Sequence, residues 1–184
     1  MPDIHVKAVP VNGLFQFVTG ELAPEQLRSV LEKLGSDARW FTGHLLAHEV
    51  VPLPVVNRFT EFSAEAKKEP VKSFAKRAGR FGAELGLKSV YKFILAVLSV
   101  ESVLKKAPFI WTRVYDGGAL NVDAAENRAR IHLTNFQSSI AGCGRISGWF
   151  EVVGEHAGAK NLKVFHTTCA ADGGNECCWD FSWQ

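Results

Sequence analysis

The chain has 184 residues, a length typical of a single domain. Its 21 basic and 19 acidic residues nearly balance, which argues against a nucleic-acid-binding protein, because such proteins normally carry a clear basic excess. A hydrophobic content of 47% also excludes an intrinsically disordered chain.

The N-terminal residues are not typical of a secretory signal, since Asp3, His5 and Lys7 interrupt any apolar segment. The longest apolar run, residues 93–100, is far shorter than the ~20 residues that a membrane-spanning helix needs. We therefore expect a cytoplasmic protein without a membrane span. In that compartment its four cysteines are thiols or metal ligands rather than disulfides.

Proline and glycine positions predict helices in the first 110 residues. Pro24 suits the first turn of a helix, and Gly35 and Gly86 suit helix ends. The expected helices span residues 23–34, 54–62, 70–85 and 89–106.

The pattern changes after Pro108, where residues 109–115 are rich in aromatic and branched side chains and a turn signal follows. The expected strands span residues 109–115, 120–122, 129–133, 162–168 and 177–183, with one helix over residues 138–153. This order predicts an α+β fold in which an antiparallel sheet packs against several α-helices. We expect residues 1–70 to form a helical or irregular region packed on a core domain of residues 71–184.

Cysteine and histidine residues near the C-terminus have the spacing of a metal site. His166 and Cys169 precede the turn sequence of residues 172–175, which would bring Cys177 back beside Cys169. Cys143, near the start of the glycine-rich helix, is the candidate fourth ligand. Three thiolates and an imidazole suit tetrahedral Zn²⁺, so the sequence predicts a structural zinc. The alternative is buried cysteines of ordinary core type beside a strand histidine.

The expected helix over residues 89–106 is apolar on nearly every side, which indicates burial in a core or in a subunit interface. Phe93 and Val97 from this helix, together with Trp111 and Trp149, are candidates for the lining of a small-molecule pocket. Core packing and a homodimer contact are the alternatives.

The spacing of the four candidate ligands resembles that of the 4-vinyl reductase domain, which is related to TRAPP vesicle-tethering core subunits and to sensor domains of phenol- and xylene-responsive activators. The resemblance covers about residues 74–183, including Arg77-Ala-Gly79-Arg80-Phe-Gly82 and Cys143-Gly-Arg-Ile-Ser-Gly148. It implies a zinc site near a ligand pocket, and commonly a dimer. His166 is a departure, since this family often has glutamate there.

The sequence thus predicts a non-enzymatic, zinc-containing regulatory module that binds a small hydrophobic ligand or a partner protein. The second hypothesis is a homodimeric scaffold of the TRAPP-subunit type, and the third is an enzyme related to tetrapyrrole vinyl reductases. No Gly-x-Ser-x-Gly motif or nucleotide-binding fingerprint supports catalysis. We therefore expect no catalytic residues and no nucleic-acid partner.

Overall fold

The structure, a computed structural model, describes residues 3–87, 99–137 and 139–184. The strands are β1 (His5–Lys7), β2 (Val50–Pro52), β3 (Ala119–Ala125), β4 (Arg128–Thr134), β5 (Lys163–Thr168) and β6 (Cys177–Ser182). The helices are α1 (Ala8–Glu21), α2 (Pro24–Leu34), α3 (Leu53–Lys67), α4 (Val71–Leu87), α6 (Val100–Lys105), α7 (Ala107–Trp111) and α8 (Ile140–His156), with 3₁₀ turns η1 (Gly35–Phe41) and η2 (Ala170–Asp172).

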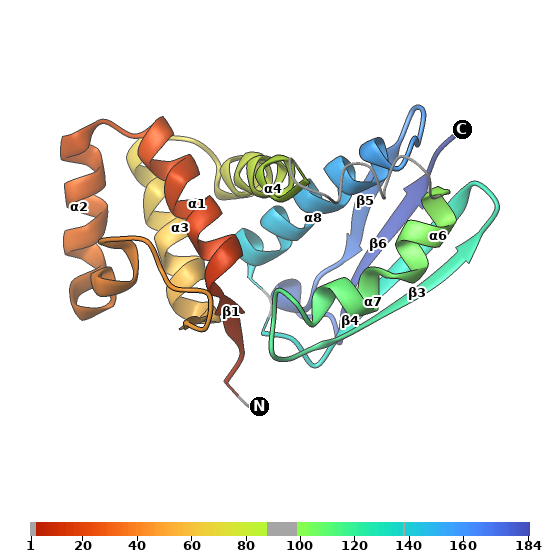
Figure 1. Cartoon of the computed structure of the whole chain (residues 1–184), viewed down its shortest axis with the longest axis horizontal. Helices are drawn as coiled ribbons and strands as arrows, with labels where there is room; N and C mark the ends of the chain where they lie inside the picture. Colours follow the sequence, from red (N-terminus) through yellow and green to blue (C-terminus); the bar gives the residue numbers. More distant parts are fainter. Residues whose placement is uncertain (1–2, 88–98, 138) are drawn as a thin grey trace.

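Two groups of elements lie on either side of a central pair of helices (Figure 1). Helices α1, α2 and α3 form one group, the four-stranded sheet with α6 and α7 forms the other, and α4 and α8 lie between them. The sheet has the strand order β3-β4-β6-β5, and all neighbouring strands are antiparallel. The predicted α+β architecture is therefore confirmed.

Helix boundaries follow the proline signals more closely than the glycine signals. Helix α2 begins at Pro24 and ends before Gly35, whose φ of 60° favours glycine. Helix α4, however, runs through Gly86 to Leu87, so the predicted stop at Gly86 is wrong. Most of the helix predicted over residues 89–106 lies outside the described residues, and α6 forms its end.

The strand predicted over residues 109–115 is also wrong, because α7 occupies Ala107–Trp111. Pro108 stands in the first turn of α7, where its missing N–H costs no hydrogen bond. Helical spacing puts Ala107 and Trp111 on one buried side. The enrichment in aromatic and branched residues was therefore a misleading signal. Only Tyr115 from this segment makes a β-bridge, to Val6.

The contact between α4 and α8 is unusually close because glycines stand where the two backbones approach. A Cβ added to Gly79 would lie 2.0 Å from the Arg145 carbonyl oxygen, and one added to Gly148 would lie 2.0 Å from that of Lys76. At Gly144, an added Cβ would lie 2.8 Å from the Ala75 Cβ. Any larger side chain would have to push the helices apart.

Ion pairs flank the same contact. Arg80 of α4 donates to Glu151 at 3.0 Å and to Glu155 at 2.8 Å, both on α8. Lys76 pairs with Glu151 at 2.6 Å. These partly exposed pairs contribute modestly to stability, but they align the two helices along the edge of their contact.

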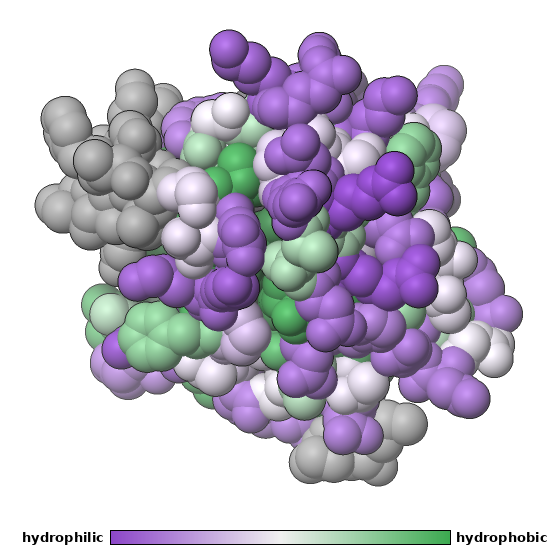
Figure 2. Space-filling model, turned by 90° about the vertical axis from the view of Figure 1, so that its right-hand side faces the viewer, coloured by the Kyte–Doolittle hydropathy of each residue, from purple (hydrophilic) through white to green (hydrophobic). Residues whose placement is uncertain are grey.

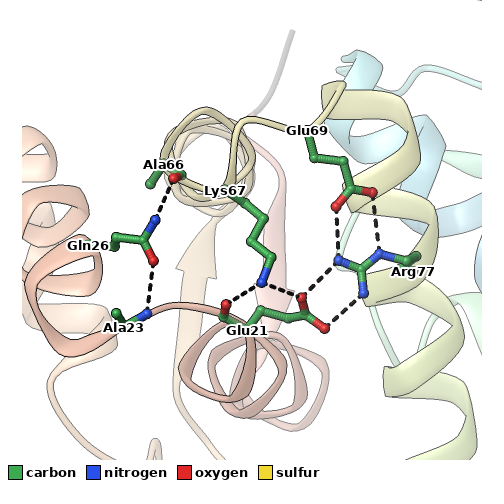
Figure 3. Close-up of polar contacts among 7 residues, drawn as sticks. All are labelled: Glu21, Ala23, Gln26, Ala66, Lys67, Glu69 and Arg77. Carbon is green, nitrogen blue, oxygen red and sulfur yellow. Dashed lines mark hydrogen bonds and ion pairs between the residues drawn. The ribbon is translucent and has the colours of Figure 1, made fainter.

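A second polar network joins α4 to the N-terminal helices (Figure 3). The Arg77 guanidinium donates to both carboxylate oxygens of Glu21, at 2.8 and 3.0 Å, and also to Glu69. Lys67 donates to the backbone carbonyl of Glu21 at 2.7 Å. The hydrogen bond from Arg77 lowers the pKa of Glu21 to about 2, so the carboxylate is charged at neutral pH. The network holds the ends of α1 and α3 against α4.

Hydrophilic residues cover most of the surface at the end of the molecule that carries the C-terminus (Figure 2). On the described part of this face, hydrophobic residues form small patches rather than one continuous area. Within residues 3–87, 99–137 and 139–184, no helix combines the length and the apolar character that crossing a membrane requires.

We expect the change Gly148→Ala to lower the free energy of unfolding by more than about 2 kcal/mol, because the new methyl group would overpack against the α4 backbone. The measurement is denaturant unfolding followed by circular dichroism.

Gly82→Ala is the matched control, since a Cβ at Gly82 of α4 meets nothing within 4 Å. Alanine should stabilise the helix there by about 0.5–1 kcal/mol. Equal effects of the two changes would contradict the close α4–α8 contact.

Candidate ligand pocket and thiol cluster

An apolar cavity of about 260 Å³ lies among α1, α4, α7 and α8. Most of its lining is aliphatic, aromatic or glycine. Representative lining residues are Leu14, Ala78, Gly82, Trp111, Ile146 and Trp149. Glycines of α4 leave room on one side, and the aromatic rings of Trp111 and Trp149 form part of the boundary.

Arg145 is one of the residues that line this largely apolar cavity. Its guanidinium donates to Thr60 Oγ1 at 2.6 Å and to Asn57 Oδ1 at 2.7 Å, and it interacts with the side chain of Tyr115, which also lines the cavity. Arg145 is half-buried, yet the surrounding protein desolvates it enough to lower its pKa. Burial also raises the pKa of the Tyr115 hydroxyl.

Arg145 has no carboxylate partner at ion-pair distance among the described residues, where Thr60 and Asn57 are neutral acceptors. Glu61 affects its pKa only through a longer-range charge interaction. The segments outside the described residues contain neither aspartate nor glutamate in their sequence. The protein therefore holds a desolvated positive charge at the cavity without a matching negative side chain, which is costly.

Of the four residues predicted to line a pocket, the structure places Trp111 and Trp149 at this cavity. Phe93 and Val97 lie outside the described residues. Arg145 was missed by the sequence reasoning. Its position one turn after the start of a glycine-rich helix gave no signal, since burial beside Thr60 and Asn57 depends on how α3 packs.

The second candidate site joins α8 to the last two strands. Cys143 stands in the first turn of α8, which begins after Ser139, whose hydroxyl accepts from the Gly142 N–H at 2.9 Å. His166 belongs to β5, Cys169 follows β5 directly, and Cys177 begins β6.

The ligand atoms of Cys143, His166, Cys169 and Cys177 all lie within 4.8 Å of one another. The Cys143 sulfur is 3.5 Å from that of Cys177 and 3.8 Å from that of Cys169. The backbone N–H of Ala170 donates to the Cys177 sulfur at 3.4 Å. The hydrogen bond with Cys177, and then burial, raise the pKa of the Cys143 thiol. Burial raises the pKa of Cys169 as well.

The imidazole of His166 carries a buried nitrogen, Nε2, with no hydrogen-bond partner among the described residues. The ring stacks on Trp179, its cross-strand neighbour, with ring centres 4.5 Å apart. A buried polar nitrogen without a partner is uncommon and calls for an explanation. An electron-pair acceptor bound in the cluster would provide one.

Trp179 also fixes the strand β6 to α8. Its indole N–H donates to Ser147 Oγ at 2.8 Å, and the Ser147 hydroxyl donates to the Cys143 carbonyl oxygen at 2.8 Å. Phe150 of α8 packs edge-to-face on Trp179. These contacts set the distance between Cys143 on the helix and Cys177 on the strand.

Cys178 belongs to a different group, together with His132 and Glu176. Its sulfur lies 3.5 Å from His132 Nδ1 and donates to Glu176 at 3.3 Å. Burial raises the pKa of Cys178 to about 11. The alternation of strand side chains thus separates Cys178 from its neighbour Cys177.

The arrangement of the whole chain is similar to that of solved H-NOX proteins. An H-NOX protein from S. oneidensis in the Fe(II)NO ligation state aligns with a TM-score of 0.74 and 15% identity, covering 97% of this chain and 99% of that chain. The H-NOX domain from Shewanella oneidensis in the Fe(II)CO state has a TM-score of 0.71 and 15% identity, with coverages of 97% and 98%. A Cs H-NOX mutant gives a TM-score of 0.72 and 11% identity, with coverages of 97% and 96%.

No family model matches the sequence, and no curated protein matches it. At 11–15% identity, the structural likeness establishes the fold alone. The H-NOX arrangement accounts for residues 1–70 as well as for the rest of the chain, since it covers 97% of the residues.

The predicted relationship to 4-vinyl reductase domains and TRAPP subunits is therefore wrong. The three functional hypotheses that depended on this relationship are wrong as well: the zinc-containing regulatory module, the TRAPP-type scaffold and the vinyl-reductase-related enzyme. The prediction of structural zinc is also wrong by this comparison, because the neighbours' titles name iron and heme. The physical reason is that a cysteine and histidine spacing is a local property of one hairpin and one helix end, which different folds can share.

Proposed function

We propose that this chain is a small-molecule-binding domain whose cavity among α1, α4, α7 and α8 holds a largely apolar ligand. The observation that supports the proposal is the largely apolar cavity of about 260 Å³, whose described lining includes two residues with polar side-chain groups that can ionise, Arg145 and Tyr115. Ligand pockets commonly combine such a lining with few polar groups, at volumes of about 300–1,000 Å³. The ligand should accordingly be small.

Binding without catalysis fits the lining best. Among the described residues that bound the cavity, Arg145 and Tyr115 are the ionisable ones. This lining holds no carboxylate, imidazole or thiol that would serve as a nucleophile or as a general base. A homodimer, a protein partner and a cytoplasmic location remain predictions.

Haem requires a separate test, since the titles of the structural neighbours name it. Protein ligands of haem iron are histidine, cysteine, methionine or tyrosine. The described lining holds none of the first three, and residues 88–98 contain none of them in their sequence. The described lining does hold one tyrosine, Tyr115, but burial raises its pKa and so opposes the phenolate that iron would need. The described lining therefore does not fit a ligated haem.

We therefore expect that hemin added to the purified protein keeps the absorption spectrum of hemin in buffer, with no shift of the Soret band. The S. oneidensis H-NOX protein, treated identically, is the positive control. A shifted Soret band at one hemin per chain would contradict this reading of the pocket.

The pocket itself can be tested with indole, a neutral apolar probe, by isothermal titration calorimetry. We expect one molecule to bind per chain and the change Gly82→Leu to weaken binding about tenfold or more, because the new side chain enters the cavity. The matched control is Gly20→Leu, which adds the same side chain to an exposed helix position with open space around it. Failure of indole to bind, or equal effects of the two changes, would refute the proposal.

We propose separately that Cys143, His166, Cys169 and Cys177 bind one transition-metal ion, without assigning its identity. The four ligand atoms within 4.8 Å and the unpartnered buried nitrogen of His166 support this. Thiolate sulfur and imidazole nitrogen favour transition-metal ions over calcium or magnesium. Because the donors come from α8, β5 and β6, the ion would stabilise the fold by joining three elements.

Cobalt(II) is the probe for this site. Titration of metal-free protein should produce sulfur-to-cobalt charge-transfer absorption at one ion per chain, and cobalt should raise the melting temperature. Cys177→Ser should weaken the absorption and the stabilisation, whereas Cys178→Ser, in the separate group with His132 and Glu176 that could also hold an ion, should leave both unchanged. Loss of the band in Cys178→Ser instead would assign it to that second group and contradict the proposed site. Absence of the charge-transfer band in the unchanged protein would contradict the proposed site.

A further inference from the structure

We infer that the ligand of the cavity is an anion, an apolar molecule whose carboxylate group is bound by Arg145. This inference rests on the proposed small-molecule pocket and specifies the chemical class of its ligand. The observation behind it is that Arg145, whose guanidinium the protein desolvates, lines a largely apolar cavity and has no carboxylate partner among the described residues.

The hydrogen bonds of Arg145 leave donors available. A guanidinium carries five N–H groups. Thr60 and Asn57 each accept one of them, and Tyr115 makes a third interaction. At least two donors therefore remain for a ligand, which is the number that a carboxylate binds in a two-point contact.

The neutral partners of Arg145 argue against a purely structural role. A link from α8 to Thr60 and Asn57 of α3 needs only hydrogen bonds, which an uncharged amide would make without the cost of a buried charge. An anion inside the cavity would compensate the charge and use the remaining donors.

The shape of the cavity complements this anchor. Beyond Arg145, the lining consists of residues such as Ile146, Trp149 and Leu14, which favour an apolar body. Tyr115 lies beside the guanidinium and offers a hydroxyl to the same carboxylate. The expected ligand is therefore a compact aromatic or aliphatic monocarboxylate.

Two probes of nearly equal shape, one charged and one neutral, show how much the negative charge of the ligand contributes to its affinity. Indole-3-acetate carries a carboxylate, and indole-3-acetamide replaces it with a neutral amide. We expect the carboxylate to bind the unchanged protein about tenfold or more tightly than the amide in calorimetry, because only the anion offsets the guanidinium charge. The preference should disappear in Arg145→Gln and persist, although weakened, in Arg145→Lys, which keeps the positive charge.

The outcomes separate the two proposals. Equal binding of the carboxylate and the amide by the unchanged protein would overturn the anion inference while leaving the pocket intact. Binding of neither probe, nor of indole, would overturn the pocket and the inference together. Because the carboxylate–amide comparison uses the unchanged protein, the result stands even if the Arg145 variants do not fold.

Discussion

The close crossing of α4 and α8 is the constraint on which the remaining structure depends. Three glycines, Gly79, Gly144 and Gly148, remove the side chains that would otherwise separate the backbones. Glycine in a helix interior costs about 1 kcal/mol relative to alanine. The three glycines therefore lower the intrinsic stability of α4 and α8, but they allow the two backbones to come into close contact. The ion pairs of Arg80 with Glu151 and Glu155 partly offset that loss at the edge of the contact. The N-terminal helices and the sheet then pack on opposite sides of one rigid pair.

Helix α8 contributes residues to both candidate sites, Cys143 to the thiol cluster and Arg145 to the cavity. The two sites are distinct because these side chains leave the helix on different sides. Cys143 in its first turn meets the hairpin of β5 and β6, where Trp179 and Ser147 fix the distance between helix and strand. Arg145, only two residues later, projects from a different side of the helix toward α3 and the cavity. A helix turns by about 100° per residue, so a separation of two residues places these side chains on nearly opposite sides. The shift or tilt of α8 that a bulkier residue at Gly148 would cause must therefore affect both sites.

The sequence was sufficient for features that depend on neighbouring residues. Pro24 and Gly35 marked the ends of α2, and alternation located β3, β4 and β6. The turn before Cys177 and the helix start near Cys143 predicted which side chains would meet. It was insufficient where packing of distant elements decides the outcome. The aromatic and branched residues at 109–115 predicted a strand, but Pro108 and the burial of one helical side favour the helix α7 over Ala107–Trp111. The role of Arg145 depends on α3, whose side chains stand more than eighty positions earlier. The family resemblance failed because it rested on the local spacing of four ligands.

The structural neighbours are H-NOX proteins, some of whose titles name haem, whereas the side chains that line this cavity favour a small carboxylate. The identity of the ligand depends on those side chains rather than on the backbone arrangement. A backbone arrangement can persist at 11–15% identity while nearly every residue that faces a ligand changes. In the described part of this chain, the soft donors lie together in the cluster of α8, β5 and β6, and the cavity lining holds no histidine or cysteine. What the cavity offers is an apolar wall and one unmatched positive charge. The described lining therefore offers no imidazole or sulfur ligand to the iron of a porphyrin. A small carboxylate, in contrast, could accept hydrogen bonds from the N–H groups of Arg145 that do not bind Thr60 and Asn57. The fold therefore determines the position of the cavity, and Arg145 determines that its ligand carries a carboxylate.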